Sequence, residues 1–217
     1  MTDLLYLHDS YLREFDATVT AVEGDRIVLD RTAMYPTGGG QPHDTGTLTW
    51  PGGSASVVEV RKDTAAVWHR LEGGMPATGA TVHGEVDWSR RHQLMRTHTA
   101  MHLLCGVIWN AYGTPVTGGD MQPLSARMDF EFDPLPAGFA GRIEELVNAE
   151  IAADRLIEVS FLDRSIALGD ADLIRTKVSL IPATVTNIRV VDIVGLDKQA
   201  DGGTHVHSTK EVGSFAE

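Results

Sequence analysis

One stretch constrains the fold and the function of this chain more than any other, the run from Arg96 to Cys105. It contains neither Gly nor Pro and continues into an apolar segment that ends at Trp109, so it predicts a helix. His98 and His102 stand four residues apart in it, and residues at that spacing lie on one face of a helix. Two imidazoles that point in one direction suit two corners of a tetrahedral metal site.

A second pair of possible ligands lies near the end of the chain, where Asp201 and His205 flank the tripeptide Gly-Gly-Thr. Two glycines permit a tight turn that can bring both side chains to one point. Taken alone, each pair could consist of ordinary core or surface residues. Together they predict one metal ion per chain, and we expect zinc. Because a carboxylate is a hard ligand, another divalent ion is the alternative.

Three blocks of sequence carry a resemblance to a known family. Residues 98–102 read His-Thr-Ala-Met-His, residues 202–206 read Gly-Gly-Thr-His-Val, and residues 35–42 read Tyr-Pro-Thr-Gly-Gly-Gly-Gln-Pro. In this order they resemble the AlaX family, free-standing proteins similar to the editing domain of alanyl-tRNA synthetase. The family pattern is His-x3-His with Cys-x3-His, and this chain departs from it because Asp201 occupies the cysteine position.

The resemblance implies an enzyme that hydrolyses the ester of tRNA(Ala) mischarged with serine, or with glycine, with the help of a metal ion. It also implies that the Gly-Gly-Gln loop lies beside the editing site. On this basis Gln41 and Thr37 are the expected catalytic residues, and the Thr37 hydroxyl could favour a seryl over an alanyl group. The expected substrate contacts are Gly39, Gly40, Gly203 and Thr204.

Two other functions remain open at this stage. The chain could be an aminoacyl-tRNA binding protein that has lost catalysis, or a metallohydrolase of another small ester or amide. Tight tRNA binding without turnover would favour the first alternative, and turnover of free esters without tRNA would favour the second.

Composition indicates which partners and which cellular compartment to expect. The net charge of −12 argues against general binding of DNA or RNA, because phosphate binding needs concentrated Lys and Arg. Arg90, Arg91 and Arg96 are nevertheless close enough in sequence to form a local tRNA contact, although they could be ordinary solvated arginines. A single cysteine, no signal peptide and no bilayer-spanning run predict a cytoplasmic protein without a membrane partner.

Short strands with glycine-rich turns dominate residues 1–88 and predict a small β-barrel domain. The expected strands are 17–23, 25–30, 46–50, 55–60, 65–69 and 81–86. Residues 89–217 mix strands with amphipathic helices, so the fold class is α+β, with a barrel followed by an α+β editing domain. The expected elements there are a helix at 90–111 capped by Ser89, strands at 122–132, 157–162 and 188–194, and helices at 141–156 and 167–175.

Overall fold

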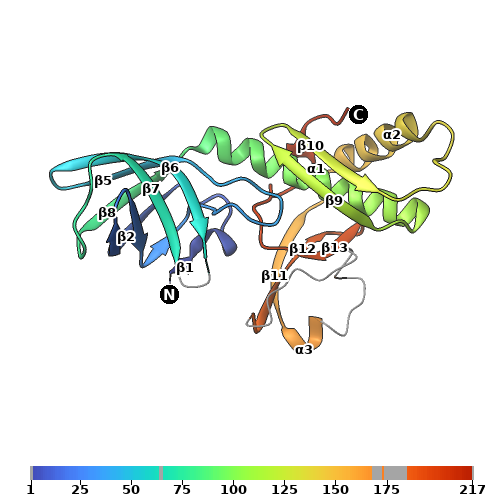
Figure 1. Ribbon diagram of the computed structural model, residues 1–217. Helices are drawn as coiled ribbons and strands as arrows, with labels where there is room; N and C mark the ends of the chain where they lie inside the picture. The colour runs from blue at the N-terminus through green and yellow to red at the C-terminus, as the bar shows by residue number, and fades with distance from the viewer. Residues whose placement is uncertain (1, 64–65, 168–172, 174–184, 217) are drawn as a thin grey trace. The chain divides into compact units, whose positions relative to one another are not determined.

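The computed structural model describes residues 2–63, 66–167, 173 and 185–216 (Figure 1). The chain forms two compact units, Met1–Leu94 and Met95–Glu217. Helix α1 (Trp88–Tyr112) runs through the boundary between these units. The division predicted from the sequence, after residue 88, falls at the beginning of the same helix.

The first unit is built on a closed barrel of six strands, and every neighbouring pair is antiparallel. Around the barrel the strand order is β2-β3-β7-β6-β5-β8. These strands are β2 (Glu14–Glu23), β3 (Arg26–Leu29), β5 (Gly46–Trp50), β6 (Gly53–Lys62), β7 (Val67–Gly73) and β8 (Thr81–Val86). The α+β class and the small barrel predicted from the sequence are thereby confirmed. A short parallel pair, β1 (Asp3–Leu4) with β4 (Arg31–Thr32), completes the sheets of this unit.

Alternation of apolar and polar residues explains which side of each strand faces the barrel core. In β2, Phe15, Ala17 and Val19 are buried, whereas the residues between them are more exposed. A strand directs successive side chains to opposite faces, so this pattern seals one face against the core. Gly84 in β8 is needed for the packing, because a Cβ atom there would lie 2.5 Å from the Phe15 ring. Apolar periodicity therefore seals the barrel core, and Gly84 permits a close approach to Phe15 that a larger residue would block.

Helix α1 begins and ends at recognisable capping residues. The Asp87 carboxylate accepts a hydrogen bond from the Arg90 backbone N–H at 3.1 Å, so Asp87 caps the helix. The prediction that Ser89 is the N-cap is wrong, because Ser89 already lies inside the first turn. Gly113, with φ of 66°, ends the helix and donates to the Trp109 carbonyl at 2.8 Å.

The second unit combines helices with a hairpin and a three-stranded sheet. The hairpin is formed by β9 (Val116–Gln122) and β10 (Ser125–Phe130), and the sheet has the order β11-β12-β13. The other elements bounded within the described residues of this unit are α2 (Phe139–Ala152), β11 (Ile157–Asp163), α3 (Arg164–Ala167), β12 (Asn187–Ile193), β13 (Asp197–Ala200) and the 3-10 helix η3 (Thr209–Val212). The first unit contains the 3-10 helix η1 (Leu5–Leu7). Within the described residues, no helix combines the length and the apolar character that crossing a bilayer requires.

The differences from the predicted elements of this unit have local causes. The predicted strand at 122–132 is the second arm of a hairpin whose first arm, β9, contains Gly118 and Gly119 and therefore has a weak strand pattern. β13 is short and polar, and it pairs with β12 just before the loop that carries Asp201 and His205. The predicted helix at 167–175 lies almost entirely outside the described residues.

Candidate metal centre

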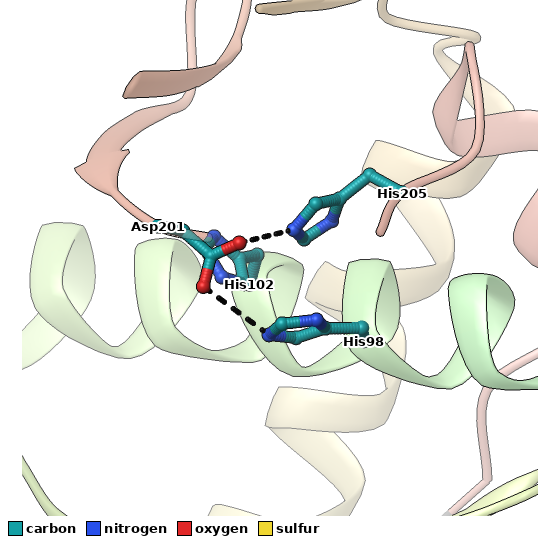
Figure 2. A group of neighbouring side chains, drawn as sticks. All are labelled: His98, His102, Asp201 and His205. Atoms are coloured by element: carbon teal, nitrogen blue, oxygen red, sulfur yellow. Dashed lines mark hydrogen bonds and ion pairs between the residues drawn. The ribbon is translucent and has the colours of Figure 1, made fainter. Parts of the chain in front are cut away.

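Four side chains from two parts of the second unit converge at one point. Helix α1 supplies His98 and His102, and the loop after β13 supplies Asp201 and His205 (Figure 2). One ligand atom from each residue lies within 4.8 Å of the corresponding atoms of the other three. The sequence-predicted set of four is therefore assembled in one place by the fold.

Individual distances show how closely the four groups approach. The Nε2 atom of His205 is 3.0 Å from Oδ2 of Asp201, and Nε2 of His98 is 3.7 Å from Oδ1 of the same carboxylate. The His205 ring centroid lies 4.4 Å from that of His98 and 4.6 Å from that of His102. All three imidazoles are buried, and the Asp201 side chain is 16% exposed. The cluster is thus a compact set of donors with limited access to solvent.

The ligand loop is held by hydrogen bonds that begin in β12. The backbone N–H of Asp201 donates to the Arg189 carbonyl at 3.2 Å, and Nη1 of Arg189 donates back to the Asp201 carbonyl at 2.9 Å. Beyond it, the Gly203 N–H donates to Oδ2 of Asp201 at 2.6 Å, which closes a turn of the Asx type. Arg189 is itself buried, with Nη1 3.7 Å from Oδ2 of Asp201. Sequence reasoning missed this arginine, because nothing in the pattern of β12 distinguishes it.

Thr99 connects the two halves of the cluster. Its Oγ1 lies 3.2 Å from Nδ1 of His205 and accepts a hydrogen bond from the Val206 backbone N–H at 3.3 Å. Thr99 directly follows His98 in the helix, so one turn of α1 provides a ligand and also contacts the opposite ligand loop. This residue was also absent from the predicted site, although it stands inside the motif that revealed the histidines.

The protonation states of the cluster favour a metal ion. Burial lowers the pKa of His98 and lowers that of His102 to about 4. Burial, followed by the proximity of His98, lowers the pKa of His205 as well. For Asp201, burial acts to raise the pKa, but the attraction of His98 and the hydrogen bond from His205 outweigh it and hold the pKa well below its usual value. At neutral pH the cluster therefore presents neutral imidazoles and an ionised carboxylate, the forms that bind metals.

The donor set also fits a tetrahedral ion by size. Four ligands at zinc distances of about 2.1 Å lie about 3.4 Å apart from one another. The ligand atoms of the cluster lie within 4.8 Å of one another, so the side chains would have to rotate inward to place all four atoms on one ion. The described residues thus contain a cluster that could bind a metal ion.

Comparison with known proteins places the chain in a family. Residues 5–90 match the family model described as tRNA synthetases class II (A), and residues 188–216 match the threonyl and alanyl tRNA synthetase second additional domain. The alanyl-tRNA editing protein AlaX-M of Saccharolobus solfataricus is 36% identical, and the match covers 99% of this chain and 91% of that protein. The chain belongs to the AlaX-M family.

Other relatives agree with this assignment. The AlaX-M protein of Methanosarcina barkeri is 35% identical over 98% of this chain and 90% of its own length. The alanine–tRNA ligase of Pyrobaculum neutrophilum is 41% identical over 96% of this chain, which corresponds to 24% of the ligase. The resemblance to the AlaX family inferred from the three sequence blocks is confirmed, and so is the prediction of an alanyl-tRNA editing enzyme at the level of this family.

In this chain the glycine-rich loop forms a tight two-residue turn in the first unit. Gly38 and Gln41 exchange both backbone hydrogen bonds, at 3.1 and 2.9 Å. Between them Gly39 and Gly40 have φ of 58° and 85°, the sign that a type I′ turn requires at both central positions. Thr37 and the three glycines are exposed, whereas the Gln41 side chain is fully buried. The turn thus explains the glycines by conformation, and it presents Thr37 rather than Gln41 at the surface.

Gly203 and Thr204, the other predicted substrate contacts, are buried in the ligand loop. The Gly203 N–H donates a hydrogen bond to the Asp201 carboxylate, so Gly203 shapes the turn that carries the ligands. Their predicted contact with substrate stays a prediction.

The three arginines that were predicted to contact tRNA have different environments. Arg91 is fully buried, and its guanidinium binds the buried Asp44 carboxylate with Nε 2.9 Å from Oδ2. It also donates to the carbonyls of Ser10 and Ala33. A phosphate cannot reach this group, so the structure contradicts the prediction for Arg91.

The other two arginines are partly exposed. Nε of Arg90 donates to the His43 carbonyl at 3.0 Å, and Arg96 donates two hydrogen bonds to the Val212 carbonyl. Both side chains therefore have an anchored orientation and some solvent access, which leaves them available as tRNA contacts.

Proposed function

We propose that this chain is a trans-editing hydrolase that cleaves the ester between serine, or glycine, and the 3′ end of tRNA(Ala). The proposal is supported by membership in a family whose named members are alanyl-tRNA editing proteins, matched over nearly the full chain. The observation that carries it is the buried His98-His102-Asp201-His205 cluster, which preserves the family arrangement of ligands apart from the cysteine position.

In this proposal the four residues of the cluster hold one zinc ion. A bound zinc ion supplies Lewis acidity, which polarises a carbonyl or acidifies water. The protein side chains keep that chemistry available at neutral pH, because the imidazoles are neutral and the carboxylate is ionised. Replacement of a thiolate by Asp201 preserves the formal charge of the ligand set while making it harder.

Recognition of the aminoacyl group is assigned to the glycine-rich loop. Thr37 offers an exposed hydroxyl, and Gly39 and Gly40 allow a ligand to approach the backbone closely. Gln41 and Thr37 stay the proposed catalytic residues, and the Gln41 side chain is fully buried in the structure. Gly203 and Thr204 complete the proposed substrate contacts from the ligand loop.

The proposed macromolecular partner is tRNA(Ala) mischarged with serine. Arg90 and Arg96 remain the candidates for phosphate contacts, and Arg91 is left out because it is buried. The net charge of −12 means that such contacts must be few and local, so binding should weaken with salt only modestly. The predicted cytoplasmic location stays a prediction.

The decisive experiment measures release of serine, glycine and alanine from the corresponding aminoacylated tRNA(Ala) by the purified chain. Metal content is determined on the same sample by mass spectrometry. The expected result is rapid, metal-dependent loss of serine with alanyl-tRNA(Ala) left intact, and about one zinc ion per chain. His98→Asn and His102→Asn are the matched variants, and both should lose metal and activity together.

Other outcomes would distinguish the alternatives. Binding of aminoacyl-tRNA with no hydrolysis after zinc is restored would indicate an inactive binding protein. Hydrolysis of simple amino acid esters with no dependence on tRNA would indicate a different metallohydrolase. Either result would refute the editing function.

A further inference from the structure

A chain of hydrogen bonds lies behind the exposed hydroxyl of Thr37. Its Oγ1 is 3.0 Å from Nδ1 of His43, and Nε2 of His43 is 3.1 Å from the backbone carbonyl of Val58. His43 lies just after the glycine turn, and its ring spans the space between the loop and strand β6. The imidazole therefore connects the hydroxyl at the loop surface to a fixed point of the barrel.

The carbonyl that receives this contact is made available by an irregularity in β6. The pairing register of β6 with β7 shifts between Val57 and Glu59, so Val58 is the extra residue of a β-bulge. An extra residue is left out of the regular ladder, and its backbone groups can serve other partners. The loop is fixed at a second point of the same strand, because the Thr37 backbone N–H donates to the Val60 carbonyl at 3.1 Å.

These contacts fix the tautomer of His43. A backbone carbonyl can only accept a hydrogen bond, so Nε2 of His43 must carry a proton to donate to Val58. Burial and the charge of Arg90 lower the pKa of His43, which keeps the ring neutral at pH 7. A neutral ring that is protonated at Nε2 has a bare Nδ1, which accepts a hydrogen bond from the Thr37 hydroxyl.

The direction of this last hydrogen bond determines what Thr37 can offer to a ligand. Because its only hydroxyl proton points to His43, the outward side of Oγ1 presents lone pairs, and the hydroxyl acts as an acceptor. A hydroxyl group on a ligand can donate to it, and a methyl group or a hydrogen atom cannot. A site that requires such a hydrogen bond rejects analogues that lack the hydroxyl.

We propose that His43 is a positioning residue for substrate specificity, which orients the Thr37 hydroxyl as an acceptor for the side-chain hydroxyl of a seryl group. The inference rests on the proposed function, in which Thr37 contacts the aminoacyl group. His43 itself does not touch the substrate. Arg90 supports the arrangement, since its Nε donates to the His43 carbonyl at 3.0 Å and fixes the backbone of the residue.

Two substitutions separate the two hydrogen bonds of the ring. In His43→Asn, the amide oxygen can occupy the place of Nδ1 and accept from Thr37. In His43→Gln, the amide nitrogen can occupy the place of Nε2 and donate to Val58, but no acceptor remains near the Thr37 hydroxyl. Thr37→Val removes the hydroxyl while keeping the shape of the side chain. It serves as the reference for complete loss of the hydrogen bond between Thr37 and the seryl group.

The first measurement is kcat/KM for seryl-tRNA(Ala) and glycyl-tRNA(Ala) with each variant. We expect His43→Gln to lower the ratio of seryl to glycyl hydrolysis by about tenfold, the value of one hydrogen bond. His43→Asn should retain most of this ratio. In a chain that already carries Thr37→Val, His43→Gln should lower the ratio little further. Equal losses for both substrates, or equal ratios in the Asn and Gln variants, would overturn the proposal. A wild-type chain that hydrolyses neither substrate would refute the proposed function instead.

The second measurement does not depend on activity. Nitrogen chemical shifts of the histidine side chains report which ring nitrogen carries the proton. We expect His43 to be the Nε2–H tautomer at pH 7, and its Nδ1 resonance should shift in Thr37→Val. A proton on Nδ1, or no response to Thr37→Val, would exclude the proposed orientation even if the chain edits seryl-tRNA(Ala).

Discussion

The hydroxyl of Thr99 lies 3.2 Å from Nδ1 of His205, so the helix that carries two of the cluster histidines also orients the third. In the structure Nε2 of His205 faces Oδ2 of Asp201 at 3.0 Å. That carboxylate oxygen accepts a hydrogen bond from the Nε2–H group, and the Thr99 hydroxyl can then donate a hydrogen bond to the bare Nδ1. If Nε2 bound a metal ion, the ring proton would be carried by Nδ1, and the same hydroxyl oxygen could accept a hydrogen bond from the Nδ1–H group. A hydroxyl at this position therefore suits both states.

The first prediction concerns this contact. Thr99→Val keeps the size of the side chain but removes the hydrogen bond to His205, and we expect metal affinity to fall by about 10- to 100-fold. Competition with a chelator of known affinity measures the change. Thr99→Ser retains the hydroxyl and is the matched control, so it should remain within a few-fold of wild type. Unchanged affinity in Thr99→Val would mean that the hydroxyl does not orient the ligand.

The second prediction concerns the ligand that departs from the family pattern. Asp201→Cys restores the thiolate, and we expect the variant to keep one metal per chain while preferring zinc more strongly over manganese or cobalt. Asp201→Ala should lose most of the metal, because it leaves three neutral ligands beside the positive charge of Arg189. Metal content after dialysis against mixed ions reports both effects. Stoichiometric metal in Asp201→Ala would show that the carboxylate is not a ligand.

The cluster was predictable from sequence because its signals are local. Helical spacing places His98 and His102 on one face, and two glycines allow Asp201 and His205 to meet within one short loop. That the two pairs meet in space could only be inferred by considering them together, because each pair alone is weak evidence for a metal site. Thr99 and Arg189 were missed because they contact the ligand residues, and residues with that role follow no recognisable spacing in a sequence.

The arginines show where local patterns fail. Arg90 and Arg91 are neighbours with identical chemistry, yet a helix directs adjacent residues to different sides. Arg91 points into the first unit and meets Asp44, 47 residues earlier in the chain, and no periodicity encodes that encounter. The barrel strands were easier to predict, because alternation and glycine turns act over a few residues.

The third prediction follows from the buried histidines. Burial lowers the pKa values of His69 and His102 to about 4, below the usual 6.5, so the folded state binds fewer protons than the unfolded state between these values. The free energy of unfolding therefore falls as pH is lowered from about 6.5 towards about 4, and the stability is fully present above that window. Each residue should contribute about 2 kcal/mol of this loss at pH 5.

Denaturant titrations of the metal-free chain at pH 7 and pH 5 measure this loss. Removal of metal matters, because a bound ion would stabilise the folded state by itself. His102→Asn should flatten the fall in stability between the two pH values. His83→Asn is the control: the hydrogen bond that His83 donates to Asp16 raises the pKa of that exposed histidine, so its removal should not flatten the fall. An unchanged slope in His102→Asn would show that this histidine does not titrate on unfolding.

The fourth prediction separates structural from binding arginines. Arg91→Ala leaves the buried Asp44 carboxylate without its counterion, and removal of one member of a buried pair costs about 3–5 kcal/mol of stability. Arg90→Ala, the neighbouring substitution at a partly exposed position, should change stability by less than about 1 kcal/mol. For tRNA binding we expect the opposite: Arg90→Ala should lower the affinity more than Arg91→Ala does. The difference in affinity between Arg90→Ala and wild type should become smaller at high salt. Chemical denaturation and tRNA binding on the same two variants test the distinction. A stable Arg91→Ala chain with weakened tRNA binding would contradict this distinction. Arg91 would then have to break its contact with Asp44 to reach tRNA.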